Sequence, residues 1–162
     1  LLHRAGLHDP TGFADRVAIL EAGRIVQAGT LEEVTSRPRS RYVADLVGVN
    51  LFSGTVANGV LTTGTGAMVA VADEMAGPAF VVLRPQSITL TRDRPMGTSA
   101  RNTWHGTITD LDRLGERVRV KVDGVLPLTA EITVGALAEL QLRPGDEVFA
   151  TAKATDVDCY AT

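Results

Sequence analysis

The chain has 162 residues, room for one ordinary domain or two small ones, with the 44% hydrophobic and 22% charged residues of a folded globular protein. Its net charge of −3 gives no basic excess, which excludes nucleic acid as an expected partner. The single cysteine, Cys159, rules out an internal disulfide and a cysteine cluster for zinc, and it favours a reducing compartment. No apolar run approaches the roughly 18 residues of a membrane helix, and no signal peptide is visible.

The first third of the chain predicts a β hairpin followed by two short helices. Residues 17–20 are a short apolar run, and 24–29 are a second short strand after a Gly turn, which is typical of a hairpin. Thr30 is the expected N-cap of a helix that Pro38 must end. A second helix is expected over 40–48, with Ser as its N-cap, Gly as its C-cap and one apolar stripe at helical spacing.

From residue 50 the pattern changes to short strands. Asn58-Gly59 is a strong hairpin turn signal between the first two of them. Residues 92–97 are charged and contain Pro and Gly, so they predict a linker, with a domain boundary at 97 or 98. The strands expected before this linker cover residues 51–56, 60–63, 67–72, 79–83 and 87–91.

The remaining residues predict a compact β unit. Residues 117–122 alternate strictly between apolar and polar, as in a strand with one face in water. A short helix is expected over 134–142, and Trp104, the only tryptophan, is expected to pack in the core or at an interface. Five strands and one helix in about 60 residues suggest a small closed barrel of the OB type. These strands cover residues 104–111, 117–122, 126–132 and 147–152, with 156–160 as a possible fifth.

Residues 14–30, which read ADRVAILEAGRIVQAGT, resemble the segment that follows the switch histidine in ABC-transporter ATPases. The resemblance continues through residues 31–34 and 42–44, although any hairpin followed by a helix would share part of the pattern. His8-Asp9 is similar to the switch loop itself, in which the histidine contacts the γ-phosphate and the attacking water. His8 is therefore the candidate catalytic residue. Residues 1–7 depart from the family because they are not a clean apolar strand, and the spacing from His8 to residue 14 is short.

Residues 98–109, which begin TSARN, resemble the opening of the molybdate-binding Mop or TOBE domain. The middle and the end of that domain are matched by 130–133, 140–145 and 152–157. Residues 83–88 resemble a strand of the regulatory domains of importer ATPases. With these segments in family order, the chain resembles the C-terminal part of the ATP-binding subunit of a molybdate ABC importer.

This resemblance implies a mainly β chain with an α/β tail at its start. Residues 1–49 would be the incomplete C-terminal tail of an ABC nucleotide-binding domain, and 50–97 a β-rich connecting or regulatory segment. Residues 98–162 would be an OB-like Mop/TOBE barrel that binds the oxyanion.

Molybdate is a dianion with four acceptor oxygens and no donors, so its site needs converging N–H groups, hydroxyls and a cation. The resemblance implies a molybdate site made by Ser99, Ala100, Arg101, Asn102, Thr133 and Lys153. Such sites form in the family where two domains meet. As alternatives, Ser99 and Asn102 would only cap a turn, and Arg101 would bond carbonyls at a domain interface. The family often has a serine where this chain has Ala136, which weakens one class of site.

Three motifs of ATP hydrolysis are missing from the sequence: the phosphate-binding loop, the Asp-Glu pair that holds Mg²⁺ and the signature L-S-G-G-Q. The chain begins with Leu rather than Met, and we expect it to be a fragment that cannot hydrolyse ATP. ATP and Mg²⁺ would bind only in a full-length parent.

Three other functions compete with an importer subunit for molybdate. A stand-alone molybdate store is disfavoured by residues 14–30, which such a protein does not need. An importer tail for sulfate, iron or a sugar is disfavoured by residues 99–102. A truncated product without function is the third alternative, and the residues do not distinguish molybdate from tungstate.

The expected partners follow from the same resemblance. A small barrel with open edges and a site of widely separated segments is expected to pair with a second copy of itself. Membrane permease subunits of the importer would hold the chain at the cytoplasmic face of the membrane.

Overall fold

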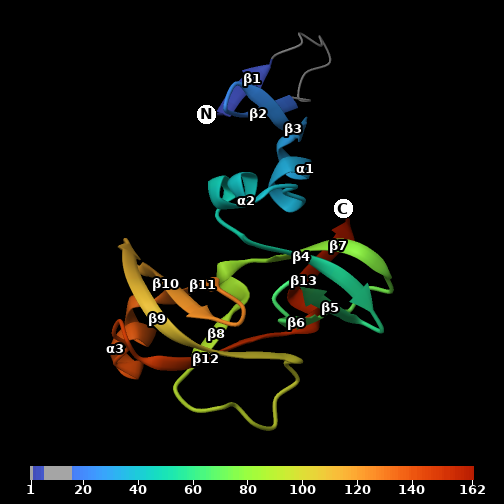
Figure 1. The fold of residues 1–162 in the computed structure, drawn as a ribbon. Helices are drawn as coiled ribbons and strands as arrows, with labels where there is room; N and C mark the ends of the chain where they lie inside the picture. Colours follow the sequence, from blue (N-terminus) through green and yellow to red (C-terminus); the bar gives the residue numbers. More distant parts are fainter. Residues whose placement is uncertain (1, 6–15) are drawn as a thin grey trace.

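The structure, a computed structural model, describes residues 2–5 and 16–162. The expected hairpin and helices are present, and one more strand completes a three-stranded antiparallel sheet in the order β1-β2-β3. His8 lies outside the described residues. The elements of this N-terminal unit, at the top of Figure 1, are β1 (Leu2–Ala5), β2 (Arg16–Glu21), β3 (Arg24–Thr30), α1 (Leu31–Ser36) and α2 (Arg41–Val47).

The three predicted helix caps, Thr30, Ser40 and Gly48, are confirmed. The Thr30 hydroxyl accepts a hydrogen bond from the Glu33 N–H at 3.1 Å, and the Glu33 carboxylate accepts one from the Thr30 N–H at 2.8 Å. The Ser40 hydroxyl accepts from the Val43 N–H at 3.2 Å. Gly48 ends α2 with a φ of 78°, a left-handed conformation that glycine adopts without strain. These caps explain why two such short helices form.

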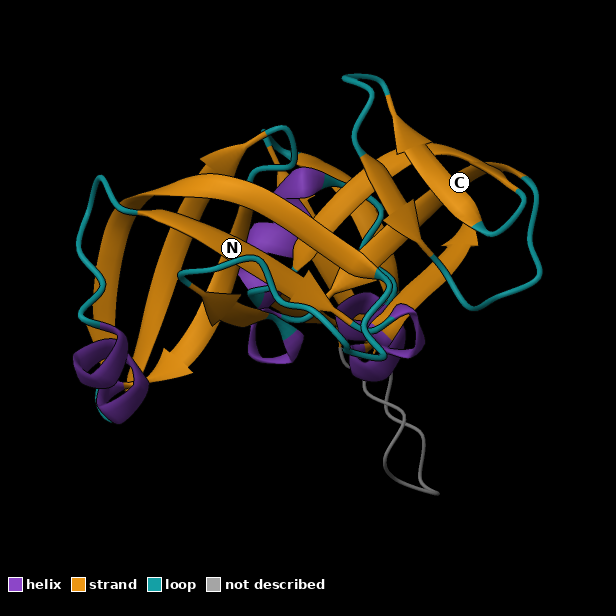
Figure 2. Ribbon diagram, turned by 90° about the horizontal axis from the view of Figure 1, so that it is seen from below, coloured by secondary structure: helices purple, strands orange, loops and turns teal. Residues whose placement is uncertain are grey.

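The rest of the chain folds into two curved five-stranded sheets, which lie side by side in Figure 2. One has the strand order β13-β7-β4-β5-β6 and the other β11-β10-β9-β12-β8. The first repeat, as we call residues 50–91, contains β4 (Asn50–Ala57), β5 (Val60–Thr63), β6 (Met68–Ala70), β7 (Gly77–Leu83), the 3-10 turn η1 (Pro85–Ser87) and β8 (Thr89–Thr91). The second repeat, residues 102–161, contains β9 (Asn102–Leu114), β10 (Arg117–Gly124), β11 (Leu128–Thr133), α3 (Val134–Leu140), β12 (Glu147–Ala152), η2 (Ala154–Asp156) and β13 (Val157–Ala161).

The two repeats have the same architecture and exchange their last strands. In the first repeat the strands pair in the order β7-β4-β5-β6, and in the second they pair in the matching order β12-β9-β10-β11. The last strand of each repeat joins the sheet of the other repeat: β8 pairs with β12, and β13 pairs with β7. The expected fifth strand of the C-terminal unit, 156–160, is therefore placed in the other sheet. The expected strand 87–91 is shorter, because Pro85–Ser87 forms a turn. The domain boundary at 97 or 98 stays a prediction, and each sheet takes one strand from across it.

A single hydrophobic core extends through both repeats. Trp104 is 6% exposed, and its indole N–H donates to the Met68 carbonyl of the other repeat at 2.9 Å. This confirms the expected core position of the tryptophan. Val118, Val120 and Val122 are buried on one face of β10, as the alternation of that strand predicts. The mainly β, OB-like fold class is thus confirmed, in the form of two sheets with a shared core.

Tyr160 on β13 joins the β sheets to the helical segment. Its hydroxyl donates to the Pro38 carbonyl between α1 and α2, and its ring lies 5.7 Å from Phe80 and 6.0 Å from the Arg37 guanidinium. Burial raises the pKa of Tyr160 above its ordinary value, an effect that the positive charges of Arg39 and Arg37 partly offset.

We expect alkaline pH to destabilise the fold through this tyrosine. The folded chain keeps a proton that the unfolded chain releases near the ordinary tyrosine pKa of 10.0. The contribution of Tyr160 to stability is therefore complete below that pH and is lost as pH rises above it. Urea unfolding should show that the free energy of unfolding falls more between about pH 8 and about pH 11 in the wild type than in Tyr160→Phe. The same pH dependence in both proteins would contradict the assignment.

Candidate functional site

Strand pairing brings the start of the second repeat next to Lys153. Asn102 at the beginning of β9 lies opposite Ala152 at the end of the antiparallel strand β12. Arg101 and Lys153, each one residue beyond this pair, therefore lie at the same end of two neighbouring strands. Ser99, Arg101 and Lys153 are all exposed. The structure thus brings Arg101 and Lys153, which are far apart in sequence, to one end of the sheet, and Ser99 lies in the loop that leads to this end.

Some of the donors at this end of the sheet already make hydrogen bonds within the chain, and others do not. The Ala100 N–H donates to the Thr98 hydroxyl at 2.9 Å, and Arg101 Nη1 makes a long contact of 3.5 Å with the Thr98 carbonyl. In the part of the chain that the structure describes, the Ser99 hydroxyl and the Lys153 ammonium have no hydrogen-bond partner. Ser99, Arg101 and Lys153 can therefore donate to an anion from solvent, while Ala100 is occupied within the loop.

Asn102 has a different place from the other predicted ligands. Its side chain is 3% exposed, its Oδ1 accepts from the Ala70 N–H at 2.7 Å, and its Nδ2 donates to the Ala70 carbonyl at 2.9 Å. The amide therefore connects β9 to the end of β6 in the other repeat, and it holds the residues before it in place.

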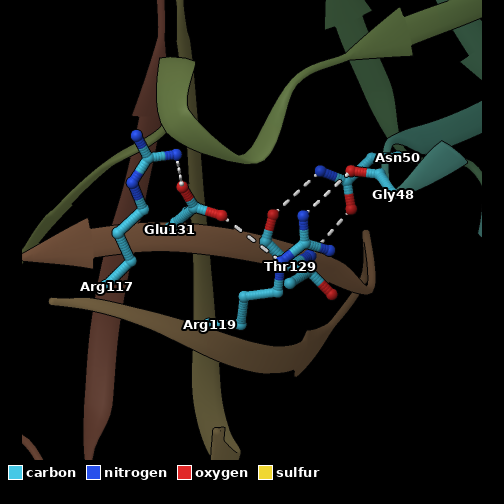
Figure 3. Close-up of polar contacts among 6 residues, drawn as sticks. All are labelled: Gly48, Asn50, Arg117, Arg119, Thr129 and Glu131. Carbon is cyan, nitrogen blue, oxygen red and sulfur yellow. Dashed lines mark hydrogen bonds and ion pairs between the residues drawn. The ribbon is translucent and has the colours of Figure 1, made fainter. Parts of the chain in front are cut away.

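Asn50 makes the same type of contact at the start of the first repeat, and the sequence analysis missed it. Its Nδ2 donates to the carbonyls of Leu83 at 3.1 Å and Thr129 at 2.9 Å, and its Oδ1 accepts from the Thr129 N–H at 2.8 Å. Figure 3 shows Asn50 facing the Thr129 backbone. The spacing Asn-x-x-x-Gly, which occurs at residues 50–54 and again at 102–106, is the signal that could have revealed both asparagines.

Thr133 is not brought to this edge within one chain. Its hydroxyl accepts from the Ala136 N–H at 3.0 Å and so caps α3. It pairs with Arg117, which in turn pairs with Leu114 at the other end of β9. Leu114 and Asn102 are the two ends of the 13-residue strand β9, roughly 40 Å apart along the strand.

A cavity lies between α2 and the second repeat, away from the end of the sheet that carries Arg101 and Lys153. The cavity has a volume of about 580 Å³ and is lined by three basic and two acidic side chains, whose charges nearly balance: Arg41, Arg119, Lys121, Asp45 and Asp123. It is therefore a weaker candidate for a dianion than the edge with Ser99 and Lys153. Within residues 2–5 and 16–162, no three His, Cys, Asp or Glu side chains are grouped so that they could hold a metal. None of the described helices is long and apolar enough to cross a membrane.

Comparison with known proteins identifies a known domain in the C-terminal region. Residues 98–159 match the model of the TOBE domain. The molybdate/tungstate import ATP-binding protein WtpC of Pyrococcus horikoshii is 35% identical over 91% of this chain and 43% of its own length. The molybdenum import ATP-binding protein ModC of Mycobacterium tuberculosis H37Rv is 37% identical over 93% of this chain and 43% of its own. The chain thus spans less than half the length of these relatives, and import ATP-binding proteins named for iron and for sulfate also match.

A solved structure is also similar to this chain. The cytoplasmic molybdate-binding protein ModG, in a form with molybdate bound, superimposes with a TM-score of 0.61 and 25% identity. The match covers 70% of this chain and 96% of ModG.

Proposed function

Because the chain belongs with the C-terminal parts of molybdate and tungstate import ATP-binding proteins and carries a TOBE domain, we propose that it is the molybdate-binding regulatory part of an importer ATPase subunit. The observation that supports the proposal is the pairing of Asn102 with Ala152, which brings Arg101 and Lys153 to the same end of two neighbouring strands, where the run that contains Ser99 enters β9. Two cations and a free hydroxyl, with no carboxylate in the run 99–102, suit a tetrahedral dianion. Tungstate, with nearly the same size and charge, would use the same donors.

The position of Thr133 supports a site that is shared between two copies of the chain. Within one copy Thr133 lies at the opposite end of β9 from Lys153, so both can contact one oxyanion only if a second copy supplies one of them. We therefore propose a homodimer in which Ser99, Arg101 and Lys153 of one copy face Thr133 of the other. Asn102 and Ala100 would shape this site through their backbone positions.

The remaining parts of the proposal concern the parent subunit. Residues 1–49 would continue an ATPase domain whose switch histidine is His8, and 50–97 and 98–162 would form the regulatory unit. ATP and Mg²⁺ would bind to the ATPase domain, and this chain alone would not hydrolyse ATP. The permease subunits would hold the whole subunit at the cytoplasmic face of the membrane.

A molybdate store without transport function is the second candidate, and the near-complete match to ModG favours it. The N-terminal hairpin and helices favour the importer, because ModG matches only 70% of the chain while the importer subunits match over 90%.

The site can be tested through the two lysines of the chain, Lys121 and Lys153. We expect Lys153→Ala to weaken molybdate binding on the order of tenfold to hundredfold, since a charge-assisted hydrogen bond contributes about 1.5–3 kcal/mol. Ser99→Ala should lose less, because a neutral hydrogen bond contributes about 1 kcal/mol. Calorimetric titration with molybdate measures these affinities.

Lys121→Ala is the matched control, because Lys121 lies on β10 and lines the cavity beside α2. The molybdate affinity of this variant should equal that of the wild type. Normal binding by Lys153→Ala would refute the site. Sulfate has the same charge and shape but is smaller, so it should compete poorly. Competition by sulfate at equal concentration would favour an importer for another solute.

A further inference from the structure

Residues of the second repeat hold helix α2 on both sides. Before the helix, the Pro38 carbonyl accepts a hydrogen bond from the Tyr160 hydroxyl of β13. After the helix, the carbonyl of its C-cap Gly48 accepts one from Arg119 of β10 at 3.4 Å. Although α2 has only seven residues, its position relative to the β sheets is thus fixed by two separate strands.

The contact before α2 leads directly to Lys153. Only the turn η2 separates Lys153 from β13, and the Asp156 N–H donates to the Lys153 carbonyl at 3.0 Å within that turn. β13 is then paired with β7 along its whole length, from Val157 to Ala161. Because this connection is short and hydrogen-bonded, a shift of the Lys153 backbone displaces the strand that carries Tyr160.

The contact after α2 leads to the strand that ends in Thr133. Arg119 Nε donates to the Glu131 carboxylate at 3.3 Å, and Arg117 donates to the other oxygen of the same group at 3.3 Å. Figure 3 shows the three charged side chains in a row, with Arg119 between Glu131 and Gly48. The Glu131 side chain is only 12% exposed and lies two residues before Thr133 on β11.

The segment before α2 is also attached to the N-terminal sheet. The Gln27 side chain donates to the Arg37 carbonyl and accepts from the Arg39 N–H, both at 2.9 Å. Residues 37–39 therefore have contacts with β3 on one side and with β13 on the other. A change in this segment reaches the part of the chain that resembles the ATPase.

We propose that α2 is the element through which the oxyanion site acts on the N-terminal unit, by way of the Tyr160–Pro38 and Arg119–Gly48 contacts. The inference rests on the proposed function, because the proposed ligand Lys153 immediately precedes the turn that leads to β13, and Thr133 ends β11, whose Glu131 bonds Arg119 of β10. A bound dianion restrains both strands, and the helix between their contacts becomes less free to open. Ligand binding and stabilisation of α2 are then coupled.

Hydrogen exchange of the full chain, with and without sodium molybdate, tests this coupling. The readout is the exchange of the Ala44 and Gly48 amides, which donate to the carbonyls of Ser40 at 3.0 Å and Ala44 at 2.9 Å. In the wild type, molybdate should slow this exchange by about fivefold or more, the lower end of typical allosteric coupling. Tyr160→Phe and Arg119→Gln should each reduce the effect while molybdate affinity, measured by calorimetry, stays unchanged.

Arg113→Gln is the matched control, because Arg113 on β9 donates only to the Gly115 carbonyl of its own turn. It should keep the full response of the wild type. Binding of molybdate by the wild type without any change in α2 would overturn this inference alone. A full response in both contact variants would overturn it as well. Absence of binding by the wild type would overturn the proposed function and, with it, this inference. If one contact variant does not fold, the other still decides.

Discussion

Replacing Gly54 by alanine is expected to lower the free energy of unfolding by about 3–5 kcal/mol, the largest effect that we expect for an added methyl group at any of the described glycines. A Cβ at this position would lie 2.2 Å from the Thr62 carbonyl oxygen and 2.8 Å from its carbon. Both atoms belong to the backbone of β5, which pairs with β4 at Thr55 and Thr62. The clash can be relieved only by separating the two strands. Urea unfolding followed by circular dichroism measures the change.

Gly64→Ala provides the comparison, because a Cβ there would have no atom within 4 Å. Its stability should stay within about 0.5 kcal/mol of the wild type. Gly106 occupies the position of Gly54 in the second repeat, where a Cβ would lie 2.6 Å from the Asp123 carbonyl oxygen. If Gly54→Ala were as stable as Gly64→Ala, the inference that β4 and β5 are too close for a Cβ at Gly54 would be wrong.

Replacing Asn102 by leucine is expected to cost about 2–4 kcal/mol, although the two side chains are similar in size. Leucine cannot accept from the Ala70 N–H or donate to its carbonyl, so both backbone groups at the end of β6 lose their partner. The loop before Asn102 should also become less ordered, and molybdate should bind more weakly. Thermal unfolding and calorimetry measure the two effects.

Gln86→Leu removes an exposed amide and should change stability by less than about 0.5 kcal/mol. Asn50→Leu should be as destabilising as Asn102→Leu, because Asn50 makes the corresponding contacts with Thr129. Full molybdate affinity in an Asn102→Leu protein that still folds would show that Asn102 does not position the loop.

The hairpin and the two helices of the N-terminal unit were predictable from the sequence because their signals are local, whereas the strand β1, which has no clean apolar run, was missed. The caps at Thr30, Ser40 and Gly48 depend on residues within one helical turn, and each was found where the sequence placed it. The turn at Asn58-Gly59 is likewise set by the backbone preferences of two residues.

The exchange of β8 and β13 was not predictable from such signals. The runs 87–91 and 156–160 have similar lengths and follow similar turns, so nothing local decides which sheet each one joins. The choice depends on pairing with β12 and β7, which are distant in sequence.

The candidate site stays a prediction: the resemblance identified Ser99, Arg101 and Lys153, and strand pairing brings Arg101 and Lys153 to the same end of the sheet. Neither the burial of Asn102 nor the separation of Thr133 from the Asn102 end of β9 could be predicted, since both depend on the course of β9 through the whole sheet.

The strand exchange also constrains the order in which the chain can fold as it is synthesised. The first repeat is translated as far as β7 long before β13 exists, so the free edge of β7 waits for its partner while more than 70 residues are added. During this time the ribosome-bound chain exposes an apolar strand edge, which is a hazard for misassembly. The second sheet has no such delay, because β8 is made before β12. The sheet whose strands β4 to β7 are synthesised first is therefore completed last, and it can be completed only after both repeats have been synthesised.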